Sequence, residues 1–134
     1  MVSCSRNKRT AAGQRILITI TMDKDFGMKK YHVHINVEKL EGVCPLYLPG
    51  QTVAILNRWY FESRPEMKLC SHAVAAMLTA LGPFSKGVSA RELGFGKEDD
   101  IAFIQCPDPG EPYSCGGTVT FRLERGEIAD SGHQ

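Results

Sequence analysis

The sequence predicts an α+β fold, with a mainly antiparallel sheet of about five strands and one main helix packed on a face. Residues 16–22 and 31–37 alternate apolar and polar side chains with the period of a half-buried strand. Residues 71–81 repeat apolar side chains at helical spacing. Two further alternating runs near the end of the chain complete the expected sheet.

The first two strand patterns differ on their outward faces. Residues 16–22 place Ile and Met on one face, whereas the outward face of residues 31–37 carries His32 and His34. Turn-forming residues at 23–27 separate the two runs, which favours a hairpin between them.

The middle of the chain predicts a short strand and one clear helix. Pro45, Pro49 and Gly50 impose turns before a strand over residues 52–56. Ser71 is the expected N-cap of the helix, and Gly82-Pro83 is its expected stop signal. The residues expected to face the core are Val74, Met77, Leu78 and Leu81.

The last third of the chain predicts a short helical turn and two strands. A turn of helix is expected over residues 90–93, and strands are expected over 101–106 and 118–124. The loop between these strands is rich in proline and glycine, and antiparallel pairing is the natural arrangement.

Length and charge limit the classes of function. The 134 residues suit a single domain over 16–125, between a flexible basic tail over 1–15 and a flexible tail over 126–134. A net charge of +1 offers no strong field, so we expect neither a nucleic acid nor a membrane as partner. A homo-oligomer or a protein partner stays open. No signal peptide or long apolar run is evident, so we expect the cytoplasm.

Five cysteines are the most informative residues, namely Cys4, Cys44, Cys70, Cys106 and Cys115. An odd count in a reducing compartment argues against a disulfide framework. Metal binding, thiol chemistry and simple burial stay open. Cys44, Cys70 and Cys106 each lie at the end of an expected element, and element ends meet at common rims of a small domain, so we hypothesise that these thiols converge on one site.

Cys70 has the strongest local argument for reactivity. A thiolate beside a helix N-terminus is stabilised by the unpaired amides and the helix dipole. Arg64 and Lys68 add positive charge nearby, and His72 is a candidate proton carrier. The alternative is a packed thiol, because Cys70 also continues the apolar stripe of the helix.

A metal site is the second interpretation of the cysteines. Zinc or another thiophilic metal would use Cys44, Cys70 and Cys106, with Cys115 or a histidine as the fourth ligand. No pair has the two-residue spacing of a zinc knuckle. Cys106 and Cys115 could also form an oxidised pair or stay unlinked. His32 and His34 could bind a metal or an anion, or form a solvated face.

Other candidate residues are less specific. Trp59, Tyr60 and Phe61 could stack on a ligand, although aromatic residues of a small domain usually lie in the core. Asp108 could orient a thiol, although its proline-rich surroundings favour a turn-capping role. No catalytic triad, phosphate-binding glycine loop or paired-carboxylate motif is present.

Three motifs occur in order along the chain: GVCPLYLPGQTV, a Cys70-led helix of small residues, and IQCPDPG followed by TVTFRLER. This order resembles a family of small, functionally uncharacterised bacterial and archaeal cysteine-containing proteins. The resemblance spans residues 16–125 and implies recurring positions at Cys44, Cys70, Cys106 and Asp108. Ser71-His72 replaces a tryptophan-containing segment of the family, and the turn around residues 111–117 is longer. The resemblance names no reaction.

Two functional hypotheses follow from these patterns. The first is a thiol or metal site built from Cys44, Cys70 and Cys106, with Asp108 as orienting carboxylate and His72 as proton carrier. The second is a noncatalytic binding or accessory subunit module, in which aromatic residues and a strand edge dock a partner and the cysteines are structural.

Overall fold

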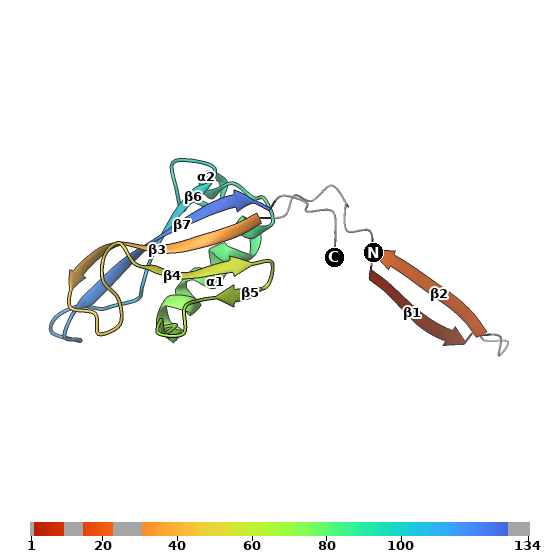
Figure 1. Cartoon of the computed structure of the whole chain (residues 1–134), viewed down its shortest axis with the longest axis horizontal. Coiled ribbons are helices and arrows are strands. Elements are labelled where there is room, and N and C mark those ends of the chain that lie inside the picture. Colours follow the sequence, from red (N-terminus) through yellow and green to blue (C-terminus); the bar gives the residue numbers. More distant parts are fainter. Residues whose placement is uncertain (1, 10–14, 23–30, 129–134) are drawn as a thin grey trace.

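The main structural unit is a five-stranded antiparallel sheet with one long helix on one face (Figure 1). The structure, a computed structural model, describes residues 2–9, 15–22 and 31–128, with side chains from residue 31 onward. The strand order in this sheet is β5-β4-β3-β7-β6. The predicted α+β class, the strand number and the single main helix are confirmed.

The sheet is built around its longest strands, β3 and β7. Its members are β3 (Tyr31–Gly42), β4 (Thr52–Asn57), β5 (Tyr60–Glu62), β6 (Ile101–Gln105) and β7 (Gly117–Glu127). β3 and β7 pair from Tyr31 opposite Glu127 to Gly42 opposite Gly117. The predicted strands over 31–37, 52–56, 101–106 and 118–124 are confirmed, as is the antiparallel pairing of the last two.

The first two strands form a separate two-stranded sheet. β1 (Val2–Arg9) and β2 (Arg15–Met22) pair antiparallel, with Arg9 opposite Arg15. The predicted strand over 16–22 is confirmed, but its partner is β1, and the predicted hairpin with β3 is wrong. Alternation reveals a strand but not its partner, and β3 pairs instead with β4 and β7.

Strands β1 and β7 contain residues outside the range expected for the domain, 16–125. Residues 2–9 form a strand where a tail was expected, because their polar sequence lacks the apolar period on which the prediction relied. β7 continues through Glu127, beyond the expected boundary at 125. The expected turn over 23–27 and residues 129–134 of the expected tail lie outside the described residues.

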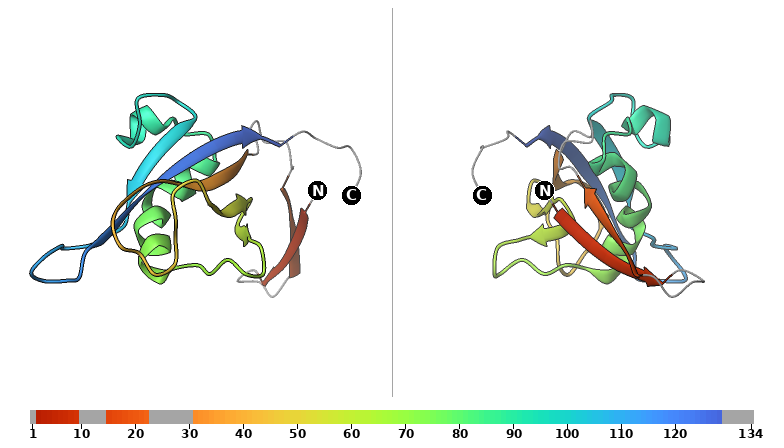
Figure 2. Two further views of the ribbon diagram at one scale, coloured as in Figure 1. Left: turned by 60° about the vertical axis from the view of Figure 1, so that its left-hand side comes forward. Right: turned by 90° about the vertical axis from the view of Figure 1, so that its right-hand side faces the viewer.

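The helix α1 (Ser71–Ser85) lies against one face of the sheet (Figure 2), and the hydrophobic core lies between them. The sheet buries Val33, Ile35, Val37, Val119, Phe121 and Leu123 against the helix. The buried residues of the helix are Ala73, Met77, Ala80, Leu81, Phe84 and Ser85. Leu78, expected to face inward, is 55% exposed, because the true stripe is centred on small alanines that allow close approach to the sheet.

Both ends of α1 differ from prediction. Cys70, rather than Ser71, is the N-cap, and its side chain makes no capping hydrogen bond. The helix continues past Gly82-Pro83 to Ser85, because the fully buried Phe84 ring anchors the last turn in the core. No helix in the described part of the chain is long and apolar enough to cross a membrane.

The short helix α2 (Ala90–Leu93) occupies the predicted residues. The Ser89 hydroxyl caps it by accepting a hydrogen bond from the amide of Arg91 at 3.1 Å. Gly94 ends it with a φ of 80°, a left-handed conformation that glycine adopts without strain.

Arg125 joins the end of β7 to the connections around both helices. Its guanidinium donates hydrogen bonds to the carbonyl oxygens of Phe84 at 2.9 Å, Val88 at 2.8 Å and Asp99 at 3.3 Å. It also pairs with the Asp100 carboxylate at 2.9 Å. The rings of Phe84 and Tyr31 stack on the guanidinium, and Arg125 as a whole residue is only 9% exposed.

We expect Arg125→Met to lower the free energy of unfolding by about 3 kcal/mol, because three carbonyl oxygens lose a charged donor. Urea unfolding measures the change. The control is Arg122→Met, on the opposite sheet face, where a partly exposed pair with Glu124 at 3.1 Å should contribute less than about 1 kcal/mol. Equal losses in both variants would contradict the anchoring role of Arg125.

Candidate functional site

Three cysteines lie at one end of the sheet because of its antiparallel topology. Cys44 follows the end of β3, and Cys106 follows the end of β6. Gly42 pairs with Gly117 at the start of β7, so these strand ends are neighbours. The N-terminus of α1, with Cys70 as its N-cap, lies at the same end.

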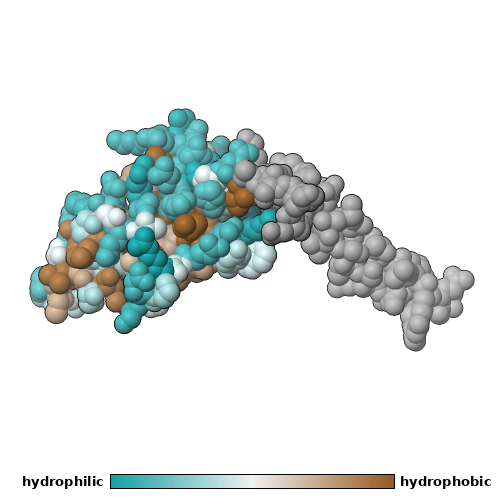
Figure 3. Space-filling model, in the orientation of Figure 1, coloured by the Kyte–Doolittle hydropathy of each residue, from teal (hydrophilic) through white to brown (hydrophobic). Residues whose placement is uncertain are grey.

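A pocket of about 330 Å³ opens at this end of the molecule. Its lining is mainly apolar and includes all three thiols. The lining residues are Cys44, Pro45, Leu46, Tyr47, Cys70, His72, Ala73, Cys106, Pro107, Asp108, Pro109, Ser114, Gly117, Val119 and Phe121. Figure 3 shows hydrophobic residues gathered on the surface at this end, where Val43, Leu48 and Tyr113 are exposed.

The three thiols line one pocket but do not form a cluster. No disulfide links Cys44, Cys70, Cys106 or Cys115. Among the residues with described side chains, no group of three or more histidine, cysteine, aspartate or glutamate residues is placed to hold a metal ion. The metal site expected from Cys44, Cys70 and Cys106 therefore has no supporting geometry in residues 31–128. Cys115 is exposed and lies outside the pocket lining.

Tyr47 fixes the chain around Cys70. Its hydroxyl donates a hydrogen bond to the carbonyl oxygen of Lys68 at 2.8 Å and accepts one from the amide of Cys70 at 2.8 Å. Its ring packs edge-on against Phe121, with 5.7 Å between centroids. Burial raises the pKa of Tyr47, the amide of Cys70 opposes this shift, and negative charge on the Cys70 and Cys44 thiols adds to it. This buried hydroxyl therefore sets where the Cys70 thiol stands.

Cys106 is held by the strand that follows it. Its thiol donates to the carbonyl oxygen of Gly117 at 3.7 Å and accepts from the amide of Val119 at 3.1 Å. Its own amide donates to the carbonyl oxygen of Val119 at 2.9 Å. The sulfur thus extends the hydrogen-bond ladder between β6 and β7.

Asp108 organises the loop between β6 and β7. Its carboxylate accepts hydrogen bonds from the Ser114 hydroxyl, the Gly110 amide at 3.3 Å, the Gly117 amide at 3.0 Å and the Thr118 hydroxyl at 3.1 Å. All four donors belong to the loop or to the start of β7. The contacts support the turn-capping interpretation rather than the hypothesis that Asp108 orients a thiol.

The hydrogen bonds to Asp108 change its pKa. The Ser114 hydroxyl makes the largest contribution in lowering this pKa from its ordinary value of 3.8, and the Gly110 amide makes the next. The loop therefore binds the ionised carboxylate better than the protonated acid.

The expected neighbours of the Cys70 thiol are only partly present. His72, the candidate proton carrier, is exposed and is one of the lining residues. Arg64 and Lys68 are exposed and are not part of the lining, so they leave the pocket without a cationic side chain.

Two other predicted groups lie away from the pocket. His32 and His34 stand on the sheet face opposite α1, with ring centroids 5.0 Å apart. Trp59 and Tyr60 are 77% and 43% exposed, so the expectation of a core position is wrong for both, and only Phe61 packs against the core. A two-residue turn that begins with Arg58 at a φ of 61° carries Trp59 into solvent.

The sequence reading missed Tyr47 and Ser114. Tyr47 lies in the Cys-Pro turn, and its position two residues after Pro45 was the available signal. Ser114 lies six residues after Asp108 in the same loop, and its hydroxyl donates a hydrogen bond back to the Asp108 carboxylate.

We expect Asp108→Asn to destabilise the protein at neutral pH, because an amide NH₂ group would face four hydrogen-bond donors. The native carboxylate pKa is lowered, so its stabilising contribution is complete above about pH 3.8 and is lost as the pH falls through the lower native value. The unfolding midpoints of wild type and variant should differ at pH 7 and come together as the pH falls through the lowered native pKa of Asp108. Glu111→Gln, in the same loop, is the control, and an equal gap at neutral and at acidic pH would contradict this account.

Comparison with protein-family models, with curated proteins and with solved structures finds no match for this chain.

Proposed function

We propose that this protein binds a small, largely apolar molecule in the pocket beside α1 and that Cys70 is the thiol that reacts with the bound molecule. The observation that carries the proposal is the shared lining, in which Cys44, Cys70 and Cys106 stand among apolar side chains of one pocket. Binding pockets are typically apolar concavities with a few placed polar groups.

The charges around the pocket favour a neutral ligand. No lysine or arginine lines the described walls, so an anion would lose its hydration without gaining a partner. Asp108 is the one carboxylate of the lining, and four donors of its own loop already occupy it. A cation would therefore compete with hydrogen bonds that hold the loop together.

Hydrogen bonding distinguishes Cys70 from Cys106 as the reacting thiol. The Cys106 sulfur donates to Gly117 and accepts from Val119, so a new bond at this sulfur would remove its donor to Gly117 and crowd the Val119 amide at the start of β7. The Cys70 sulfur is not used to cap its helix. Cys70 is the N-cap residue of the 15-residue helix α1, and it lines the pocket.

We expect Leu46→Trp to weaken binding of a neutral solvatochromic dye at least about tenfold, because the larger ring fills the mouth of the pocket. Leu48→Trp is the matched control, since Leu48 is exposed in the same turn but lies outside the lining. The dye emission shift measures binding. Bound dye should also slow alkylation of the pocket thiols and leave Cys115 unaffected. Equal dye affinity in both variants, or equal protection of Cys115, would refute the pocket as a binding site.

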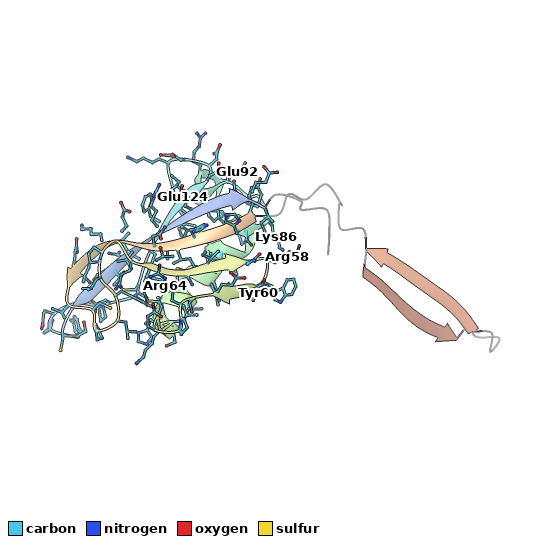
Figure 4. The ribbon with its side chains drawn as sticks, in the orientation of Figure 1. Arg58, Tyr60, Arg64, Lys86, Glu92 and Glu124 are labelled. Atoms are coloured by element: carbon cyan, nitrogen blue, oxygen red, sulfur yellow. The ribbon has the colours of Figure 1, made fainter. Side chains whose placement is uncertain are left out.

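A second function, a noncatalytic binding or accessory subunit module, is favoured by one other observation. Trp59 stands at the tip of the β4–β5 hairpin with 77% of its surface exposed and stacks edge-on against Tyr60, with 5.6 Å between centroids. Figure 4 shows Arg58 and Tyr60 projecting from this tip. Tryptophan, tyrosine and arginine are residue types enriched in protein interfaces.

For this second function we expect the protein to sediment above its monomer mass of 14.8 kDa and Trp59→Ala to sediment as a monomer. Tyr113→Ala removes another exposed aromatic ring, 82% exposed in the loop before β7, and should leave the mass unchanged. Cys70→Ser should also leave it unchanged, because the thiols have no part in this function. A monomeric wild type at high protein concentration would exclude self-association through the hairpin tip.

A further inference from the structure

We infer that the molecule taken up by the pocket is a neutral carbon electrophile of the α,β-unsaturated carbonyl class, to which the Cys70 thiol adds. This inference rests on the proposed function and names its ligand class. It follows from three features of the described lining, namely its apolar side chains and thiols, the absence of lysine and arginine, and the presence of His72 as a group that can carry a proton.

The addition can be written with all atoms retained. The Cys70 sulfur forms a bond to the β-carbon, and the carbon–carbon double bond becomes single as its electron pair moves to the α-carbon and the carbonyl oxygen. The proton of the thiol ends on the α-carbon. No group leaves, no electron is gained or lost overall, and neither an oxidant nor a reductant is consumed.

The lining disfavours reactions that expel an anion. Alkyl halides and disulfides release a halide or a thiolate, which needs a cation or several donors to stabilise it. Among the described residues no lysine or arginine lines the pocket, and the carboxylate of Asp108 would repel a departing anion. An addition also develops negative charge, on the carbonyl oxygen, but this charge is removed when the proton reaches the α-carbon, so no separate anion has to leave the pocket.

His72 is the lining residue that can move the proton. It lies two residues after Cys70, on the first turn of α1, and is exposed at the pocket. An imidazole can take the thiol proton and return it to carbon near neutral pH. The lining also contains the hydroxyl groups of Tyr47 and Ser114, but both already donate hydrogen bonds. Tyr47 donates to the carbonyl oxygen of Lys68, and Ser114 donates to Asp108.

The size of the pocket sets the size of the electrophile. A volume of about 330 Å³ lies at the lower end of the range for small-molecule sites, so a monocyclic or short-chain enone fits the space. The apolar walls would bind the hydrocarbon part, and the carbonyl group would face His72, the exposed histidine of the lining.

The test compares two reagents at two thiols of the full-length protein. 2-Cyclohexen-1-one reacts by addition, whereas iodoacetamide reacts by substitution and releases iodide. Peptide mass spectrometry gives the rate of each reagent at Cys70 and at Cys115, the exposed thiol outside the pocket. We expect the ratio of addition rate to substitution rate to be at least about tenfold higher at Cys70 than at Cys115, a modest share of what general acid–base catalysis can supply.

Two variants and one analogue assign the effect. His72→Gln should lower the addition rate at Cys70, and Cys70→Ser should remove the mass gain at this position. Cyclohexanone, which has the shape of the enone without the double bond, should slow the addition by occupying the pocket.

The outcomes separate the two proposals. If cyclohexanone or the dye protects Cys70 but the rate ratio is the same at both thiols, the pocket binds apolar molecules and the inferred electrophile class is wrong. If neither molecule protects Cys70, the proposed function itself is wrong. A raised ratio that persists in His72→Gln would overturn the role of His72.

Discussion

The position of α1 on the sheet depends on one buried guanidinium. Arg125 binds the carbonyl oxygen of Phe84 at the end of this helix and reaches the connection before β6 through Asp99 and Asp100. At the other end of the helix, the Tyr47 hydroxyl accepts a hydrogen bond from the amide of Cys70 and so holds the N-terminus of α1 in place. Because no buried side-chain nitrogen or oxygen in the described part of the chain lacks a partner, these two anchors give orientation without leaving a desolvated polar group.

The candidate site follows from the way in which α1 packs on the sheet. An antiparallel sheet brings the end of β3, the end of β6 and the start of β7 to one edge, and the helix held by Arg125 and Tyr47 begins over that edge. The space between them is the pocket, and cysteines happen to occupy three of the chain ends that line it. Thiols far apart in sequence thus share a cavity because of topology rather than through any local motif.

Periodicity was a good guide to elements and a poor guide to their partners. The alternation in β2, β3 and β7 and the small helix α2 could be predicted because each depends on local spacing. The pairing of β2 with β1 could not, since β1 is polar and pairing depends on nonlocal hydrogen bonds. The passage of α1 through Gly82-Pro83 was also hidden, because burial of Phe84 outweighs a local stop signal.

The site shows the same division. Placement of Cys44, Cys70 and Cys106 at element ends was predictable from turn residues, whereas their arrangement without a metal cluster depends on tertiary distances. Trp59 illustrates the opposite error, because aromatic content alone predicts burial and the turn beginning at Arg58 carries the ring outward. Tyr47 had no sequence period to reveal it, since its role comes from two hydrogen bonds across 21 and 23 positions of the chain.

The sulfur of Cys106 both lines the pocket and hydrogen-bonds to the start of β7. It stands among the lining groups and at the same time accepts the Val119 amide as a backbone oxygen would. A guest large enough to push this sulfur aside would deprive that amide of its acceptor and loosen the first residues of β7. A ligand in the pocket would therefore affect β7, the strand that contains the buried Phe121. Occupancy of the pocket and local opening of the first residues of β7 are thus coupled.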